Sequence, residues 1–450
     1  MSFGMILTIA MMVIIVILIV TNASHPGIIM AGVPIVIAII LGLSQGVPFV
    51  ARSGPSVFKN IQSWINQGSN MIVGTLMLMI FAILFFSMLH ELGVFKFLVN
   101  KILGVLKNSV LGVMIATVFI AILTQLDGSG STTALCTIPP LKPVYEKMKI
   151  RVQALLFLEC LASGIWIFLP WAPALNETSA YLKGAGFEVE AYDIFKWAIP
   201  LAIFSTVLLI LLCIPLSIIE KKKGAGMTNE EYAALREEIT KPVELPYGKG
   251  KAIFAGIFTI VIMLLILFGI LPSAVTFIIG YIVLALLVYK KPKDIADYIR
   301  RQAPMIFNLT MTMLGVAVLV GVLNGMGTMK EFADMIAASS GGALKHIPWI
   351  CACFSLVLSF ITGGAKMSVV IPAVAAIGAS FGIAPAAVAG AIIICGSAGA
   401  GLNPFSGSSY LGLNLAGLEM GQHLKYSLLP TFIFGIIQAV FCGVTGLLPF

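Results

Sequence analysis

The chain has 450 residues, of which 59% are hydrophobic and only 10% charged, and its formal net charge is +8. Soluble domains carry roughly 25% charged residues, so this composition, with a mean hydropathy of +1.06, excludes a soluble globular enzyme, a disordered chain and a disulfide-stapled secreted domain. Apolar stretches of about 20 residues recur along the whole length, which predicts an all-α polytopic membrane protein.

Residues 1–219 are expected to form a unit of five full spans and one hairpin. The spans are predicted at 4–20, 28–43, 71–89, 152–183 (broken at 169–173) and 195–219. A mildly amphipathic stretch, 58–67, precedes the third span, and an amphipathic helix, 90–108, follows it. Residues 110–148 form two apolar arms around a polar tip, 127–133. Each arm is too short, at ~1.5 Å per residue, to cross a ~30 Å hydrocarbon core, which indicates a re-entrant hairpin.

Residues 220–251 carry 13 charges and read as a solvated linker. Residues 252–450 then repeat the order of the first unit. Spans are expected at 252–270, 273–289, 303–323, 385–418 (broken at 399–407) and 428–446. An amphipathic stretch, 324–346, precedes a second hairpin, 349–381, with its tip at 362–368. Matching features lie 229–235 residues apart. Because five is odd, the two units must have opposite orientations, and this is the inverted repeat of secondary transporters.

Basic residues set the expected orientation. With the linker in the cytoplasm, the cytoplasmic segments hold 20 Lys and Arg residues and the outer segments six, as the positive-inside rule requires. The protein is then a multi-pass protein of the cell (inner) membrane with both termini outside. The basic residues lie at the ends of apolar runs rather than in one patch, so a nucleic-acid partner is not expected.

Three ionisable residues fall at membrane depth in this topology: Asp127, Glu159 and Lys366. A charge there is costly, so each needs a partner or a purpose. Asp127 and Lys366 lie in the two tips, where they either bracket a transport site or lock the tips together as an ion pair. Glu159 is either a proton carrier or a hydrogen-bonded buried carboxyl. We expect ion coupling to involve these three residues.

The tips and breaks have the composition of an anion site. Glycines allow close backbone approach, hydroxyls bind and cap, and half-helix N-termini present free N–H groups. Thr178 is expected to cap the half-helix after the first break. The predicted substrate-binding residues are Ser129, Gly130, Ser131, Thr132, Thr133, Pro170, Trp171, Gly363, Gly364, Lys366, Ser368, Asn403, Ser406 and Ser408.

Seven cysteines and four histidines are scattered along the chain without a metal-ligand spacing, and nucleotide-binding and HExxH motifs are missing. We therefore expect no resident metal, no cofactor and no enzymatic activity. An enzyme would need a catalytic pair or a metal cluster at depth.

Three motifs resemble the signatures of the citrate–metal:proton symporter family of the ion transporter superfamily. They are Leu-Asp-Gly-Ser-Gly-Ser-Thr-Thr at 126–133, Leu-Pro-Trp-Ala-Pro at 169–173, and the stretch 410–423. The resemblance covers both halves. It implies a two-repeat elevator transporter, commonly a homodimer, that carries citrate or a related di- or tricarboxylate with a coupling ion such as a proton, sodium or a divalent cation.

The sequence departs from that family at both tips. Ser129 stands where the family has a second acid, and Gly363-Gly364-Ala365-Lys366 stands where an Asn-Asp pair is usual. A lysine repels a metal cation, so we predict transport of the free anion rather than a metal complex. Coupling is then either to protons through Asp127 or Glu159, or absent. Lys366 then stands where a coupling cation binds in relatives. A cation/proton antiporter, or a transporter of another anion, is the alternative on the same fold.

Overall fold

The computed structural model describes residues 2–21, 23–51, 54–239, 245–268, 270–327, 343–362, 366–402 and 407–449. These residues are helical or irregular, without a strand. Within them, seven helices are long and apolar enough to cross a membrane, and five shorter apolar helices accompany them. The expected all-α polytopic membrane protein is confirmed.

The first half follows the predicted order. Its helices are α1 (Phe3–Val20), α2 (Pro26–Ser44), α3 (Val57–Glu91), α4 (Val94–Val105), α5 (Val110–Thr124), the 3₁₀ turn η1 (Gln125–Asp127), α6 (Gly130–Lys147), α7 (Val152–Ile165), α8 (Pro173–Gly184), α9 (Ala191–Lys222) and the linker helix α10 (Asn229–Ile239). The break in the fourth span lies between α7 and α8, and it is wider than expected because α7 ends at Ile165.

The second half is likewise helical in its described residues. Its elements are α11 (Lys249–Leu267), α12 (Ser273–Val288), α13 (Pro292–Met326), the 3₁₀ turn η2 (Ala343–His346), α15 (Ile347–Cys353), α16 (Ser355–Thr362), the π-helix η3 (Lys366–Val370), α17 (Ile371–Ser380), α18 (Pro385–Ser397), the 3₁₀ turn η4 (Ala398–Leu402), α19 (Gly407–Ala416) and α20 (Met420–Thr445). Most of the stretch 324–346 lies outside the described residues.

Two predictions about the long helices were wrong. The stretch 58–67 and the span 71–89 are one continuous helix, α3, and α13 begins 11 residues before the expected start at 303; each helix has 35 residues. The amphipathic helix after α3 is correspondingly shorter than predicted. Leu92 ends α3, and Gly93, with a φ of 76°, turns the chain into α4.

Helices α3 and α13 pack against each other in opposite directions. Near the start of α3, Trp64 and Gly68 meet Gly321 and Ala317 of α13. Near the end of α3, Leu84 accepts a hydrogen bond from the hydroxyl of Tyr298, close to the start of α13. At the last residue, Glu91 pairs with Arg301 at 3.1 Å. The two helices are therefore antiparallel along their whole length.

Glycine makes this helix pair possible. A Cβ at Gly68 would lie 1.9 Å from the carbonyl oxygen of Ala317, and one at Gly321 would lie 2.0 Å from that of Trp64. The same holds where α2 crosses α13, because a Cβ at Gly315 would lie 2.3 Å from the carbonyl oxygen of Gly27. Small residues let helix backbones approach closely in membranes, where dispersion contacts replace the hydrophobic effect between helices.

Gly68→Leu is expected to disrupt folding, because the atom in its way is backbone and cannot move aside. Overpacking costs about 1–3 kcal/mol where side chains yield, and we expect a loss at or above the upper end of this range. Gly74→Leu, on the same helix with open space around its Cα, is the matched control. Thermal unfolding followed by size-exclusion chromatography in detergent measures both; equal melting temperatures would contradict the packing argument.

The segment 110–147 is a helical hairpin, as predicted. The hydroxyls of Thr117 and Tyr145 lie 2.8 Å apart, and closer to the tip those of Thr124 and Thr137 lie 3.3 Å apart. The partners approach the tip together, so α5 and α6 run antiparallel. The first arm is longer than expected, because α5 continues into η1 and residues 110–127 reach the length of a span. The second arm continues to Lys147 despite three prolines.

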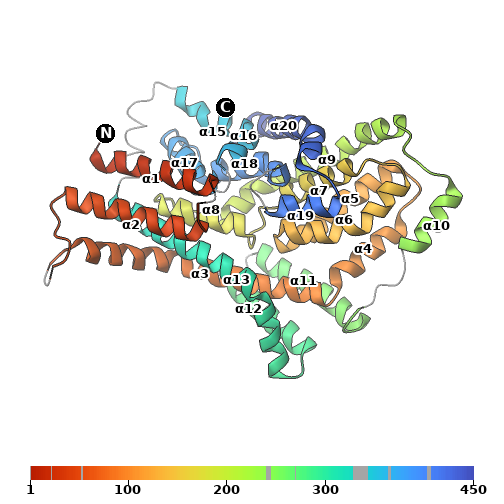
Figure 1. The fold of residues 1–450 in the computed structure, drawn as a ribbon, viewed down its shortest axis with the longest axis horizontal. Coiled ribbons are helices and arrows are strands. Elements are labelled where there is room, and N and C mark those ends of the chain that lie inside the picture. Colours follow the sequence, from red (N-terminus) through yellow and green to blue (C-terminus); the bar gives the residue numbers. More distant parts are fainter. Residues whose placement is uncertain are drawn as a thin grey trace.

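The helices form two groups (Figure 1). In one, α2, α3, α12 and α13 pack together, with α1 on α2 and α11 on α12. In the other, the hairpin helices α5 and α6 pack with α7, α9 and α19, and α15–α17 pack with α18 and α20. Helix α8 contacts both groups, through α3 and α13 on one side and α9, α17 and η3 on the other.

Most described residues of the charged linker helix α10 are exposed, and one face of it also docks on the protein. Helix α10 packs against α4 and α6, the N–H of Gly226 donates to the carbonyl of Met148 at 2.8 Å, and Tyr247 donates to Glu91 at 2.8 Å. Thr228 caps α10 by bonding reciprocally with Glu231. Hydrogen bonds from the backbone and then the side chain of Thr228 lower the pKa of the Glu231 carboxyl.

Candidate functional site

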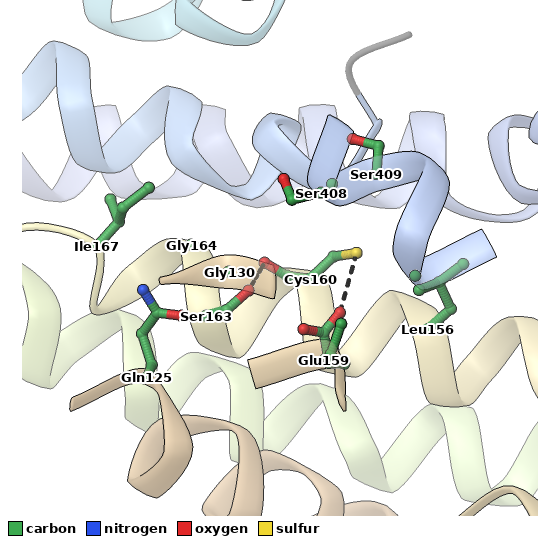
Figure 2. Close-up of a pocket in the computed structure, with 13 residues that line it drawn as sticks. Gln125, Gly130, Leu156, Glu159, Cys160, Ser163, Gly164, Ile167, Ser408 and Ser409 are labelled. Carbon is green, nitrogen blue, oxygen red and sulfur yellow. Dashed lines mark hydrogen bonds between the residues drawn. The ribbon is translucent and has the colours of Figure 1, made fainter. Parts of the chain in front are cut away.

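A small interior cavity of about 80 Å³ lies where the first hairpin, the first broken span and the second broken span meet. Its walls come from the tip of the hairpin, one face of α7, η4 and the first turns of α19 (Figure 2). The lining includes Gln125, Gly130, Glu159, Cys160, Ser163, Gly401, Ser408 and Ser409. Elements from both halves of the chain thus contribute polar groups to one buried space.

The hairpin tip is shaped by Asp127 and Gly128. The N–H of Ser129 donates to Oδ1 of Asp127 at 2.8 Å, and Gly128 has a φ of 74°, a conformation that favours glycine. A Cβ at Gly128 would also lie 2.9 Å from the Cβ of Ala172. Asp127 therefore forms the turn, and it is not among the residues that line the cavity.

The first break supports this tip. The indole of Trp171 donates to the carbonyl of Leu126 at 2.7 Å, and Nδ2 of Asn176 donates to the carbonyls of Pro170 and Ala172, both at 2.9 Å. Trp171 and Pro170 thus lie beside the tip, where they support it and do not line the cavity. The expected cap by Thr178 was wrong, because its hydroxyl bonds backward to Ala174 within α8.

Glycines bring the cavity walls together. A Cβ at Gly401 would lie 2.1 Å from Sγ of Cys160, which shows how closely η4 approaches α7. Gly130, at the start of α6, has Ser408 of α19 as its nearest neighbour, 3.8 Å from a Cβ placed there. The N-terminal turns of α6 and α19 therefore face each other across the site. Ser129 caps α6 by accepting the N–H of Thr132 at 3.4 Å.

Gln125 presents an amide group to the cavity. Its side chain is fully buried, and Oε1 accepts a hydrogen bond from Thr133 at 2.6 Å. Its Nε2 has no hydrogen-bond partner among the described residues. A buried N–H₂ without a partner is costly, and here it lies at the wall of a space that a ligand can enter.

Among the described residues that line the cavity, Glu159 is the only one with a carboxyl group. It is 3% exposed, and its single hydrogen bond is the one that Sγ of Cys160 donates to Oε2 at 3.4 Å. Within the described chain, no Lys, Arg or His pairs with it. A charged carboxylate in such a site needs a counter-ion or a proton, and the adjacent cavity gives either one access.

The second hairpin holds Lys366 away from this cavity. The ammonium donates to Oγ of Ser359 at 2.8 Å, and a Cβ at Gly396 of α18 would lie 2.9 Å from Nζ. Lys366 is 6% exposed. An ion pair between Asp127 and Lys366, the alternative to a transport site between the tips, is not among the ion pairs of the described residues.

The other predicted residues are distributed as follows. Gly130 and Ser408 line the cavity. Ser129 caps α6, and Thr133 is directed into the hairpin, toward Gln125. Ser131 and Thr132 lie in the first turn of α6 and are not part of the lining. Ser368 of η3 is buried and interacts with Tyr181 of α8. Gly363, Gly364, Asn403 and Ser406 lie outside the described residues.

Sequence reasoning missed several residues of this region. Cys160 and Ser163 carry little signal in an apolar run, yet they lie on the α7 face that lines the cavity. Glu177 was overlooked as a fourth ionisable residue, and a third carboxyl, within the spans. It follows Asn176 on α8, and no hydrogen bond or ion pair joins it to another described residue. Its position four residues after the predicted break at 169–173 was the available signal.

Comparisons with known proteins agree with this picture. The family model described as "Citrate transporter" matches residues 5–302, and that of the Na⁺/H⁺ antiporter family matches residues 237–447. The "Citrate transporter" of Bacillus subtilis (strain 168) is 26% identical over 444 residues, which cover 98% of this chain and 99% of the relative. The "Mg(2+)/citrate complex secondary transporter" of the same organism is 24% identical over 425 residues, 92% of each chain. The "Uncharacterized transporter YraO" of Bacillus subtilis (strain 168) is 24% identical over 461 residues, which cover 98% of this chain and 98% of the relative.

The apolar helices and the buried polar cavity, taken with these matches, define a multi-pass membrane transporter and not an enzyme. Since the first model covers well over half of the sequence, the chain belongs to the citrate transporter family. The resemblance seen in the motifs of the sequence is thereby confirmed.

Proposed function

We propose that the protein is a secondary transporter that carries citrate or a related di- or tricarboxylate, and that the cavity between α6, α7 and α19 is where a carboxylate group binds. The observation that carries this proposal is the set of hydrogen-bond donors around the cavity. Nε2 of Gln125 has no partner within the described residues, and the N-terminal turns of α6 and α19 lie on opposite walls.

These donors suit a carboxylate for a physical reason. The N-terminus of a helix carries free N–H groups and partial positive charge, so it stabilises an anion. An amide N–H₂ adds a neutral donor of defined direction. The cavity is small for a whole tricarboxylate, so the described conformation is expected to hold one carboxylate group while the rest of the ligand occupies space that opens when substrate binds.

Glu159 is proposed as the coupling carboxyl. It lies at the cavity wall without a cationic partner among the described residues, so it must accept a proton or a cation when the anion beside it is bound. Proton-coupled symport follows if it carries a proton with the substrate. Asp127 is bonded to the N–H of Ser129 and is the second candidate for this role.

An inverted repeat and an elevator mechanism are part of the proposal. Helices α3 and α13 have equal lengths and antiparallel directions. The helix contacts also occur in matching pairs. Between the halves, α2 packs on α13 and α12 packs on α3; within each half, α5 packs on α9 and α15 packs on α20. We propose that the hairpin-bearing group moves against the group of α2, α3, α12 and α13. The linker is then cytoplasmic, both termini lie outside, and the unit is a homodimer.

Whether a metal accompanies the anion follows from two opposing observations. A relative is named for a Mg²⁺–citrate complex, which favours a metal complex. In this chain Ser129 replaces an acid, and the described residues contain no group of three His, Cys, Asp or Glu side chains that could hold a metal ion. We propose the free anion, and Lys366, bonded to Ser359, contributes less to this argument than the sequence implied.

Uptake of labelled citrate into proteoliposomes under an inward proton gradient tests the function. We expect saturable uptake that excess unlabelled carboxylate inhibits and that magnesium, calcium or chelator leaves unchanged. A requirement for magnesium or calcium would replace the free anion with the complex as substrate. The absence of uptake of any carboxylate, with or without metal, would overturn the proposed function.

A cation/proton antiporter is the second candidate. The match of residues 237–447 to the Na⁺/H⁺ antiporter family favours it. An antiporter would produce proton movement in response to a sodium gradient in liposomes without any carboxylate, and a pH-sensitive dye inside the vesicles reports this movement. A symporter of the proposed kind gives a dye signal only when carboxylate is added.

A further inference from the structure

A second and larger cleft, of about 520 Å³, lies apart from the transport cavity, between α4 and the outer face of α6. Leu103 of α4 and Leu135, Pro139 and Pro140 of α6 supply apolar walls, and Ile239, the last residue of α10, closes one side. Lys96 of α4 also lines the cleft. The last residues of α3 contribute His90, next to the start of α4.

The charge in this cleft is positive and comes from Lys96. Lys96 is an exposed residue, and its ammonium makes no hydrogen bond or ion pair with the described chain. None of the described residues that line the cleft is a carboxylate. A single cation above mainly apolar walls is complementary to a ligand with one anionic group and a hydrocarbon portion.

The cleft also lies where such a ligand is found. Helix α10 carries four glutamates and one arginine and belongs to the charged linker, so its side of the cleft faces water. On the other side the surface is apolar and exposed: Leu135 is 47% exposed and Val105, at the end of α4, is 75% exposed. The cleft therefore connects the aqueous layer with the lipid-facing surface.

We propose that this cleft binds an anionic phospholipid. The phosphate group pairs with Lys96, and an acyl chain lies along Leu103, Leu135 and the ring faces of Pro139 and Pro140. Long basic side chains at membrane boundaries extend toward headgroups in this way, and anionic lipids attract them at the cytoplasmic surface. The lipid would lie between α4, which follows α3, and α6 of the hairpin. It would thus contact both groups of helices and influence their relative movement.

Lipid binding by the purified protein tests the proposal without any transport assay. Native mass spectrometry in detergent compares phosphatidylglycerol with phosphatidylcholine of the same acyl chains for three variants. Lys96→Glu is the test, and Lys101→Glu is the matched control. Lys101 is on the same helix and exposed, but it lies over the ring of Phe97 at 5.7 Å and does not line the cleft. Leu135→Trp fills the cleft without changing charge.

The unmodified protein and Lys101→Glu are expected to retain phosphatidylglycerol in preference to phosphatidylcholine. In Lys96→Glu the preference should fall by roughly fivefold or more, since one basic side chain near a membrane surface contributes about that factor. Leu135→Trp should lower retention of both lipids. Equal loss in the two lysine variants, or full retention in Lys96→Glu, would show non-specific attraction and overturn the site. Citrate uptake is not part of this readout. A failure of the lipid proposal can therefore be distinguished from a failure of the proposed transport function.

Discussion

Replacing Glu159 by glutamine is expected to abolish proton-driven net uptake of citrate while leaving exchange of internal for external citrate intact. Glutamine keeps the size of the side chain and its capacity to accept the Cys160 bond of 3.4 Å, but it cannot gain or lose a proton. If the substrate-loaded form moves across the membrane with a neutral group at this position, exchange continues. The return of the empty carrier, which requires release of the proton, is lost.

The experiment measures both modes in proteoliposomes. Net uptake under an inward proton gradient should fall by roughly tenfold or more, which corresponds to about 1.4 kcal/mol, while exchange stays within about twofold of the unmodified protein. Glu177→Gln is the matched control, because Glu177 is a carboxyl of α8 that does not line the cavity. If Glu177→Gln loses net uptake and Glu159→Gln retains it, the coupling carboxyl lies on α8 instead.

Gln125→Glu is expected to produce the second large effect, a steep rise in the KM for citrate. The change preserves an oxygen that can accept the hydrogen bond from Thr133, so the hairpin retains its internal contact. It removes the Nε2 donor and introduces a negative charge beside the carboxylate of the substrate. A hydrogen bond to a charged group contributes about 1.5–3 kcal/mol, so KM should rise by about tenfold from the lost donor alone, and further from repulsion.

Initial rates of citrate uptake against concentration give this KM. Gln62→Glu is the control, since it makes the same change of charge on the exposed face of α3, where Gln62 bonds to Asn66 at 3.0 Å. Its KM should be unchanged. A Gln125→Glu protein with ordinary KM would remove Gln125 from the binding site. If the maximal rate falls while KM is constant, the amide acts on the movement of the carrier and not on substrate affinity.

Hydropathy was sufficient to predict an all-α polytopic membrane protein, which the described helices confirm. The inverted repeat, which was inferred from the matched spacing of the halves, stays a prediction. The boundary expected before residue 71 was wrong because Gly68 interrupts an otherwise helical pattern. In the structure, Gly68 continues the helix, and its missing Cβ admits the backbone of α13. The sequence alone shows the glycine but does not show that the backbone of α13 packs against it.

The candidate site was predicted only in part. Gly130 of the predicted tip and Glu159 lie at the cavity wall, and their roles in binding and coupling stay predictions. The position of the Gln125 side chain depends on how α5 and α6 are aligned. The position of the Lys366 ammonium depends on its hydrogen bond to Ser359 in the same hairpin. Both are consequences of side-chain packing across helices, which periodicity does not encode.

The 35-residue antiparallel helices α3 and α13 have a consequence for the position of the protein in the bilayer. Each is about 52 Å long, against a hydrocarbon core of about 30 Å. Each begins with a polar third, which carries Gln62 and Asn66 in α3 and Asp297 and Arg301 in α13. Because the helices run in opposite directions, one polar third projects from each surface. A vertical displacement in either direction would draw polar groups into hydrocarbon, at several kcal/mol for a charged residue. Under the proposed elevator mechanism, this pair is therefore expected to keep its position along the membrane normal while the hairpin-bearing group makes the vertical movement.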